Sequence, residues 1–136
     1  MTSAASNDDL DILTRTVWGA ARRESDEGKA AVAHVIMNRF YAVGYGNSIA
    51  RICLKDKQFS YWNSDDVNYQ KIKKLKNTDK DYRHIYGIVE DAVNKRRPDK
   101  TYKSKHSHVE SVPHYWPTHK KPAAKISNHV FYNDID

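Results

Sequence analysis

The sequence predicts a mostly helical α+β fold with a small β element. Hydrophobic residues make up 39% of the 136 residues, which is enough for one modest core and too much for a disordered chain. Apolar residues recur at three- and four-residue steps over much of the chain before Pro98, which is the period of an amphipathic helix. Only residues 129–132 have clear strand character. A chain of this length usually folds as one domain, so we expect a single domain over residues 1–136.

Two long helices are expected at the start of the chain. Asn7 and Asp8 offer N-cap oxygens to the first helix, which we expect to end near Glu24. Ser25 can cap a second helix over residues 26–40. Both helices carry an apolar face at helical spacing, made of Leu10, Leu13, Val17, Ala21, Ala31, Val32, Val35 and Ile36.

Shorter elements are expected after the second helix. Ser48 can start a short helix, whereas residues 57–66 lack a helical period and predict a loop or a short strand. Two further helices are predicted, one over residues 66–76 and one that starts at Thr78. Pro98 closes the last of them, because the residue before a proline disfavours helical dihedrals.

The β element is expected near the C-terminus. Residues 129–132 read His-Val-Phe-Tyr, a composition that suits a pleated and half-buried surface. We expect this strand to pair with residues 107–112, which gives the small β element of the predicted fold.

Composition and charge narrow the possible partners. Lys and Arg total 23 against 17 Asp and Glu, a net charge of +6, which suits nucleic acid, anionic lipid or an anionic cell envelope. The single cysteine, Cys53, excludes an internal disulfide framework and a cysteine-rich zinc site. No apolar run approaches the ~20 residues of a membrane span. Residues 1–11 hold no hydrophobic stretch, so we expect no secretory signal peptide.

Three motifs carry the chemistry of the chain. The first is WGAARRE at residues 18–24, which continues into residues 27–39; the second is KQFSYWN at residues 57–63; the third is ISNHVFY at residues 126–132. In this order and spacing they resemble the cell wall hydrolase family of the spore cortex-lytic enzyme type. That family includes bacterial peptidoglycan hydrolases and phage endolysins. The resemblance covers residues 10–132 and is looser in the region between the second motif and Pro98.

The resemblance implies a lysozyme-like fold, with a substrate groove between a helical body and a small β element. The implied activity is cleavage of the β-1,4 bond between N-acetylmuramic acid and N-acetylglucosamine in peptidoglycan. Hydrolysis by a muramidase and the 1,6-anhydro chemistry of a lytic transglycosylase both stay open. The resemblance implies no metal and no cofactor. We expect peptidoglycan glycan strands as the partner, no nucleic acid, and a monomer.

The chain departs from the family pattern at residue 20. That pattern is Gly-Glu-Ala-Arg-x-Glu, and its first Glu is the catalytic acid; here Ala20 stands in that place, while Gly19, Ala21, Arg22 and Glu24 fit. A methyl group cannot donate a proton to a glycosidic oxygen. We therefore expect this sequence to be nearly inactive, as a deliberately substituted form or a natural pseudoenzyme. Without the resemblance, an alanine inside a helix would simply favour the helix.

Glu24 is the second candidate for a catalytic role. Because the first helix is expected to end near Glu24, we expect this residue one turn after Ala20 on the same helix face. It could then orient a catalytic group or a water molecule. It could equally form a structural ion pair with Arg22, Arg23 or Lys29, and the sequence leaves both interpretations open.

The second motif predicts one wall of the groove. Amide and hydroxyl groups can bond the oxygens of a sugar, while an aromatic ring stacks on its C–H surface. The residues expected to form this wall are Gln58, Phe59, Ser60 and Trp62. The alternative is a loop whose Phe59 and Trp62 fill the core; we expect Phe59 to be in the core and Gln58 and Ser60 to face the groove.

Histidines gather in the last third of the chain. They are His106, His108, His114, His119 and His129. Two histidines on one strand face could ligate zinc, but no cysteine or helical His-x-x-x-His accompanies them, and the resemblance implies no metal. We predict that His106, His108, Trp116 and His129 line the groove and bind substrate, with structural histidines as the alternative and zinc last.

Basic runs interleave with tyrosines at residues 71–76, 95–97 and 120–121. Such runs are typical of solvated faces, and they can also draw a protein to an anionic envelope. The alternatives to the enzyme are a non-catalytic peptidoglycan-binding module and then a nucleic-acid binder, whose lysines neutralise phosphates and whose aromatics stack bases. We expect synthesis in the bacterial cytoplasm and action on the cell wall after release, through a holin if the protein is a phage endolysin.

Overall fold

The computed structural model describes residues 6–42, 48–54, 62, 66, 68–109, 122–127 and 129–133, and at residues 108 and 109 the backbone alone. Over these residues the order of elements is α1 (Asn7–Ala21), α2 (Asp26–Tyr41), α3 (Ile49–Leu54), α4 (Tyr69–Lys74), α5 (Lys80–Val93), β1 (His106–Val109), β2 (Ala124–Ile126) and β3 (His129–Tyr132). The predicted mostly helical α+β class is confirmed.

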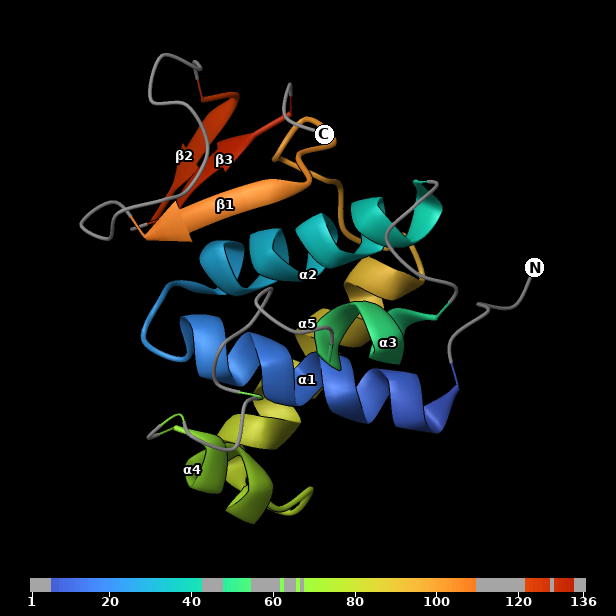
Figure 1. The fold of residues 1–136 in the computed structure, drawn as a ribbon, viewed down its shortest axis with the longest axis vertical. Helices are drawn as coiled ribbons and strands as arrows, with labels where there is room; N and C mark the ends of the chain where they lie inside the picture. Colours follow the sequence, from blue (N-terminus) through green and yellow to red (C-terminus); the bar gives the residue numbers. More distant parts are fainter. Residues whose placement is uncertain are drawn as a thin grey trace.

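The helices form a body, and the sheet covers one side of it (Figure 1). Helices α1, α2 and α5 pack against one another, and α3 packs on α1 and α2. The sheet has the strand order β1-β3-β2 with both pairings antiparallel. Strands β1 and β2 contact α2, so this helix lies between the rest of the body and the sheet.

Helix α2 is therefore buried on two sides. On one side lies the main core, to which α1, α3 and α5 also contribute; on the other, Ala31 and Val35 pack against Phe131 of β3. A helix that is apolar around most of its circumference suits this position. At 16 residues α2 is the longest of these helices. In the part of the chain that the structure describes, no helix is both long and apolar enough to cross a membrane.

Helix α1 differs from its prediction at both ends. Its N-cap is Ser6, which forms a capping box with Asp9, rather than Asn7 or Asp8. It ends at Ala21, and the Glu24 N–H bonds the Ala21 carbonyl at 2.9 Å in the turn that follows. Glu24 thus lies in the connection to α2. The expectation that Glu24 continues the helical face of residue 20 is wrong, because α1 ends at Ala21 and Glu24 lies in the turn that follows.

Helices α2 and α3 begin where the sequence predicts. The Ser25 side chain accepts a hydrogen bond from the Gly28 N–H at 3.1 Å, which is the N-cap interaction expected of serine. The Ser48 hydroxyl likewise accepts from the Arg51 N–H at 3.1 Å. The predicted second helix and the predicted short helix are both confirmed.

The later elements are confirmed with changes at their ends. Helix α4 is shorter than the predicted range 66–76, because Leu75 has an extended backbone (φ −63°, ψ 128°). The N-cap of α5 is Asp79 instead of Thr78. Strand β3 covers the predicted residues 129–132 and pairs with β1, as expected. Strand β2 was not predicted.

Candidate active site

The turn between α1 and α2 meets the turn between β2 and β3. The Ser25 N–H donates to the Ser127 hydroxyl over 3.5 Å. Gly28 lies between the two turns, since a Cβ atom on it would come within 2.9 Å of the Glu24 Cβ and 3.1 Å of the Ser127 Cβ. Glycine allows this close approach. The first and third sequence motifs, which lie at opposite ends of the chain, are thereby brought side by side.

Buried His129 and mostly buried Glu24 form a pair at this junction. The His129 Nδ1 and Glu24 Oε1 atoms lie 3.6 Å apart, and the two side chains are 5% and 11% exposed. Lys29, one of the predicted ion-pair partners of Glu24, donates from its Nζ atom to the Glu24 backbone carbonyl at 2.6 Å. The pairing of Glu24 with His129 was missed, because no local signal connects residues so distant in sequence.

Ala20 lies on the last turn of α1. It is half-buried and packs against the main core. Thr16, one turn earlier on the same face, accepts a hydrogen bond from the Trp62 Nε1 at 2.8 Å. Trp62, predicted to belong to the sugar-binding wall, therefore packs on the same face of α1 that carries residue 20.

Trp18 and Arg22 stack at the C-terminal end of α1. The Arg22 guanidinium lies 4.4 Å from the centre of the Trp18 ring, which is within the range of a cation–π interaction. The Trp18 Nε1 is buried and has no hydrogen-bond partner among the described residues. The first motif thus places an indole donor and a cation beside the turn that leads to Glu24.

The sheet separates the predicted histidines. His106 is opposite Tyr132, and directly opposed residues of an antiparallel pair share a face. The His129 ring lies on the other face, 6.2 Å from the ring of Phe131, which packs on α2. Both His106 and His129 are buried, and the described backbone of His108 continues β1. The structure therefore brings His129, but not His106, to the Glu24 junction.

Several predicted site residues lie outside the described residues. These are Gln58, Phe59, Ser60 and Trp116, whose roles stay predictions. Where the structure describes side chains, no group of three or more His, Cys, Asp or Glu residues could hold a metal ion.

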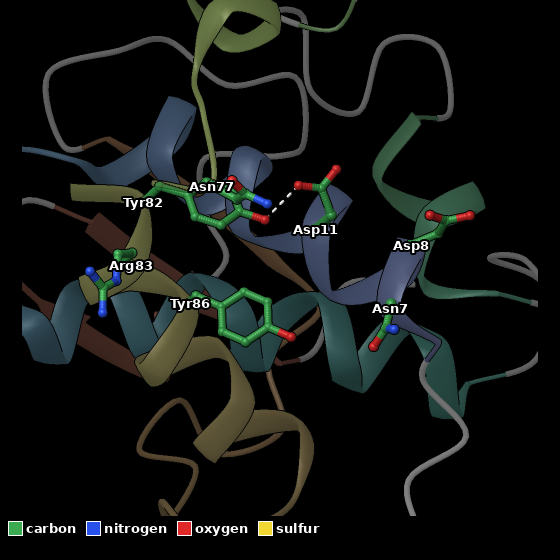
Figure 2. Close-up of a pocket in the computed structure, with 7 residues that line it drawn as sticks. All are labelled: Asn7, Asp8, Asp11, Asn77, Tyr82, Arg83 and Tyr86. Atoms are coloured by element: carbon green, nitrogen blue, oxygen red, sulfur yellow. Dashed lines mark hydrogen bonds between the residues drawn. The ribbon is translucent and has the colours of Figure 1, made fainter. Parts of the chain in front are cut away.

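A polar cavity of about 500 Å³ lies beside the N-terminal parts of α1 and α5 (Figure 2). In this view the Tyr82 hydroxyl points to Asp11, to which it donates a hydrogen bond of 2.5 Å. Burial and this bond raise the pKa of Tyr82 above its ordinary value, so the hydroxyl remains a donor. Arg15 pairs with Asp11 and also donates to the carbonyls of Ile72 and Leu75. The polar groups here connect α1 to the α4 and α5 region.

Comparison with known families covers the second and third motifs and the last two residues of the first. The model of the cell wall hydrolase family matches residues 23–132. The spore cortex-lytic enzyme of Bacillus subtilis (strain 168) is 37% identical over 60 residues, which is 44% of this chain and 20% of that protein. The chain thus matches about a fifth of the length of this relative.

Two solved structures share the fold. The catalytic domain of the Bacillus cereus SleB protein superimposes with a TM-score of 0.77 at 21% identity and covers 97% of this chain and 94% of that one. The catalytic domain of the germination-specific lytic transglycosylase SleB from Bacillus anthracis gives 0.77 at 22% identity and covers 97% and 99%. The predicted lysozyme-like fold is confirmed. Because the family model spans most of the sequence, including Glu24 and His129, the chain belongs to the cell wall hydrolase family.

Proposed function

We propose that this chain has the architecture of an enzyme that cleaves the glycan strands of peptidoglycan between N-acetylmuramic acid and N-acetylglucosamine. Membership of the cell wall hydrolase family supports this substrate class. The observation that carries the proposal is the junction at which the first and third motifs meet through the mostly buried Glu24–His129 pair. Both muramidase and lytic transglycosylase chemistry are compatible with this arrangement.

The general acid of the proposed reaction belongs at position 20. A carboxyl group at this half-buried site, against the main core, would be partly desolvated, which raises its pKa. An acid with a raised pKa retains the proton that the leaving glycosidic oxygen needs. Ala20 has no proton to give. The chain in this form therefore binds glycan without cleaving it.

Glu24 and His129 act in this proposal as positioning residues. A general acid must come within about 3 Å of the oxygen that it protonates. The Glu24 side chain is only 11% exposed and lies beside His129, so its carboxylate has little access to a large polymer. Its contact with His129 holds the α1–α2 turn against the sheet. Residue 20, at the end of α1, is thereby kept at a constant distance from the sheet.

The test is to introduce a carboxylic acid at position 20 and follow the release of muropeptides from isolated sacculi. We expect Ala20→Glu to cleave, and the unsubstituted chain and the matched Ala20→Gln variant, which has no acidic proton, to release almost nothing. General-acid catalysis typically contributes ~10²–10⁴-fold. The activity of Ala20→Glu should fall as the pH rises through the pKa of the new acid. Mass spectrometry of the products would separate reducing ends from 1,6-anhydro ends.

One outcome would overturn the assignment of the acid. If Ala20→Glu folds and binds glycan but releases no muropeptide, position 20 does not hold the acid. If Ala20→Glu is active, Glu24→Gln in the same background should lower the turnover number and leave the pH at which activity declines nearly unchanged, since Glu24 does not donate the proton.

A further inference from the structure

A second cavity, of about 590 Å³, lies toward the C-terminal end of α2. It opens between this end of α2, the end of α5 and the chain that leads to β1, drawn in orange in Figure 1. Its volume is within the ~300–1,000 Å³ range of small-molecule sites. Along α2 the ten residues from Gly28 to Asn38 rise about 15 Å. The cavity is thus separate from the Glu24–His129 junction.

Cationic side chains line this cavity. They are Lys95, Arg97, Lys103 and Lys105. In the described part of the chain, none of Lys95, Arg97 and Lys103 lies within 4 Å of a carboxylate. The Lys95 Nζ instead lies 5.2 Å from the centre of the Tyr41 ring. A concave surface with this excess of positive charge attracts an anion.

The acidic residue of the cavity, Asp99, offsets one positive charge but forms no ion pair within 4 Å with Lys95, Arg97 or Lys103. Its carboxylate accepts hydrogen bonds from the Thr101 N–H at 2.8 Å and hydroxyl at 2.6 Å, from the Asn38 amide at 3.0 Å and from the Lys103 N–H at 3.2 Å. The carboxylate is thus occupied by the chain around it. Asp99 shapes the connection between α5 and β1 and leaves the lysine and arginine head groups available.

The backbone of this connection is held in an unusual conformation. Lys95, Tyr102 and Lys103 have φ angles of 60°, 56° and 63°, and Ser127 has the only other positive φ of a non-glycine residue in the described chain. Non-glycine residues rarely adopt this left-handed backbone conformation, and residues that do so cluster at ligand sites. Besides Asp99, the Asn133 side chain fixes the connection by donating to the Tyr102 carbonyl at 3.1 Å. Lys95 and Lys103 are thereby presented to the cavity by a fixed backbone.

The cavity also offers an apolar surface. Met37, Ala92 and Pro98 line it, together with Tyr41, whose side chain is among the most exposed large hydrophobic groups of the described chain at 58%. An exposed aromatic ring can stack on the C–H face of a sugar, while guanidinium and ammonium groups bind phosphate. A single ring beside one cavity differs from the succession of rings on which nucleic-acid bases stack.

We propose that this cavity binds a phosphorylated sugar unit of an anionic envelope polysaccharide, and so holds the protein on the envelope at a second point. The phosphate would bind to Lys95, Arg97 and Lys103, and the sugar ring would pack on Tyr41. The choice of an envelope polymer as the source rests on the proposed function. The binding chemistry rests on the cavity alone.

The experiment follows amide chemical shifts during titration with glucosamine 6-phosphate, glucosamine or inorganic phosphate. We expect glucosamine 6-phosphate to bind about tenfold more tightly than either fragment, because charged hydrogen bonds and ring contacts act together. The variant Lys95→Gln/Arg97→Gln should lose about tenfold in affinity. The matched control Lys71→Gln/Lys76→Gln has the same net charge but removes exposed lysines in and after α4, and it should bind like the parent.

The controls separate this proposal from a general charge effect. Equal loss in both double variants, tighter binding of a single-stranded DNA oligonucleotide at physiological salt, or no binding of glucosamine 6-phosphate would each overturn it. If the cavity variant does not fold, as judged by thermal unfolding, Lys103→Gln at an exposed side chain replaces it. In the Ala20→Glu background, cleavage of phosphate-free peptidoglycan should not depend on Lys95 or Arg97. A failure of the proposed catalytic function would thus leave the binding result standing.

Discussion

At the scale of single residues, Gly28 and Ala20 are both small residues near the α1–α2 turn, but for different reasons. Gly28 is small because neighbouring atoms already occupy the space of a side chain. Ala20 lies half-buried at the edge of the core, at the position where we propose that the general acid belongs. A larger residue at position 28 should therefore disturb packing, whereas Glu at position 20 should add a proton donor.

Gly28→Ala should lower the free energy of unfolding. Its Cβ would lie 2.9 Å from the Glu24 Cβ, and forcing an extra methyl group into packed surroundings costs about 1–3 kcal/mol, which exceeds the gain of ~1 kcal/mol in helix propensity. The matched control is Gly87→Ala on α5, where no atom lies within 4 Å of the added Cβ and where we expect stabilisation by about 0.5–1 kcal/mol. Urea denaturation measures both. Equal stabilisation by the two substitutions would contradict the close approach at Gly28.

At the scale of elements, the connection between α5 and β1 depends on Asp99. Burial alone would raise the pKa of this carboxyl group, but the hydrogen bonds from Thr101 and Asn38 outweigh burial and hold the pKa below its usual value. The ionised carboxylate is therefore the form that the folded state prefers, and it accepts several bonds that fix one short segment.

Asp99→Asn should destabilise the fold at pH 7 by about 1 kcal/mol, because an amide cannot accept all of these hydrogen bonds. A carboxyl pKa that is depressed in the folded state stabilises at pH values above the unfolded pKa of about 3.9, and this contribution is lost as the pH falls through the folded value. The difference between parent and variant should therefore shrink below about pH 4. Urea denaturation at several pH values tests this, with Asp81→Asn, an exposed position, as the control. A difference that does not change with pH would mean that the charge of Asp99 has no role.

Elements with local signals could be predicted from the sequence. The start of α2 was predictable because Ser25 caps the helix that follows it, and β3 because its four residues favour a strand. The end of α1 was not, since nothing within the helix requires the chain to turn at Arg22. Strand β2 was missed because Ala-Lys-Ile has no strong strand preference and becomes a strand by pairing with β3.

The candidate site was predictable in part, for the same reason. The motif that contains Ala20 and Glu24 is continuous, so the sequence could identify it. The contact of Glu24 with His129 and the placement of His106 on the other face of the sheet depend on the strand register, which no local pattern encodes. The hydrogen bond from Trp62 to Thr16 is likewise a consequence of tertiary packing.

At the scale of the whole molecule, α2 couples two of the hydrophobic clusters of the described residues, the main core and the smaller cluster under the sheet. One of its sides contributes Ile36 to the main core, and another carries Ala31 and Val35 against the sheet. The proposed catalytic junction lies toward the N-terminal end of α2 and the cationic cavity toward its C-terminal end. We therefore expect the helical body and the sheet to unfold together.

Cys53 offers a direct test of this cooperativity. It is the only cysteine of the sequence, it is fully buried in the main core, and burial raises the pKa of its thiol to about 12. Because the thiolate is the reactive form, a thiol reagent at pH 8 should label Cys53 only after the core opens. In urea the labelling midpoint should coincide with the loss of helical circular dichroism. Labelling at lower urea would show that α3 opens separately, which would contradict a single cooperative domain.

A net charge of +6 could attract this chain to either of two polyanions, peptidoglycan and DNA. We expect the protein to sediment with purified peptidoglycan at physiological salt and neutral chitin-type oligomers to compete, because sugar contacts do not depend on counterion release. Binding to DNA should be weak and should fall steeply as salt rises. The variant Lys71→Gln/Lys76→Gln removes two positive charges, which weakens mainly electrostatic binding. It should therefore weaken binding to DNA further and leave sedimentation with peptidoglycan unchanged. Tight DNA binding at physiological salt without binding to peptidoglycan would place the chain among nucleic-acid binders and exclude the proposed function.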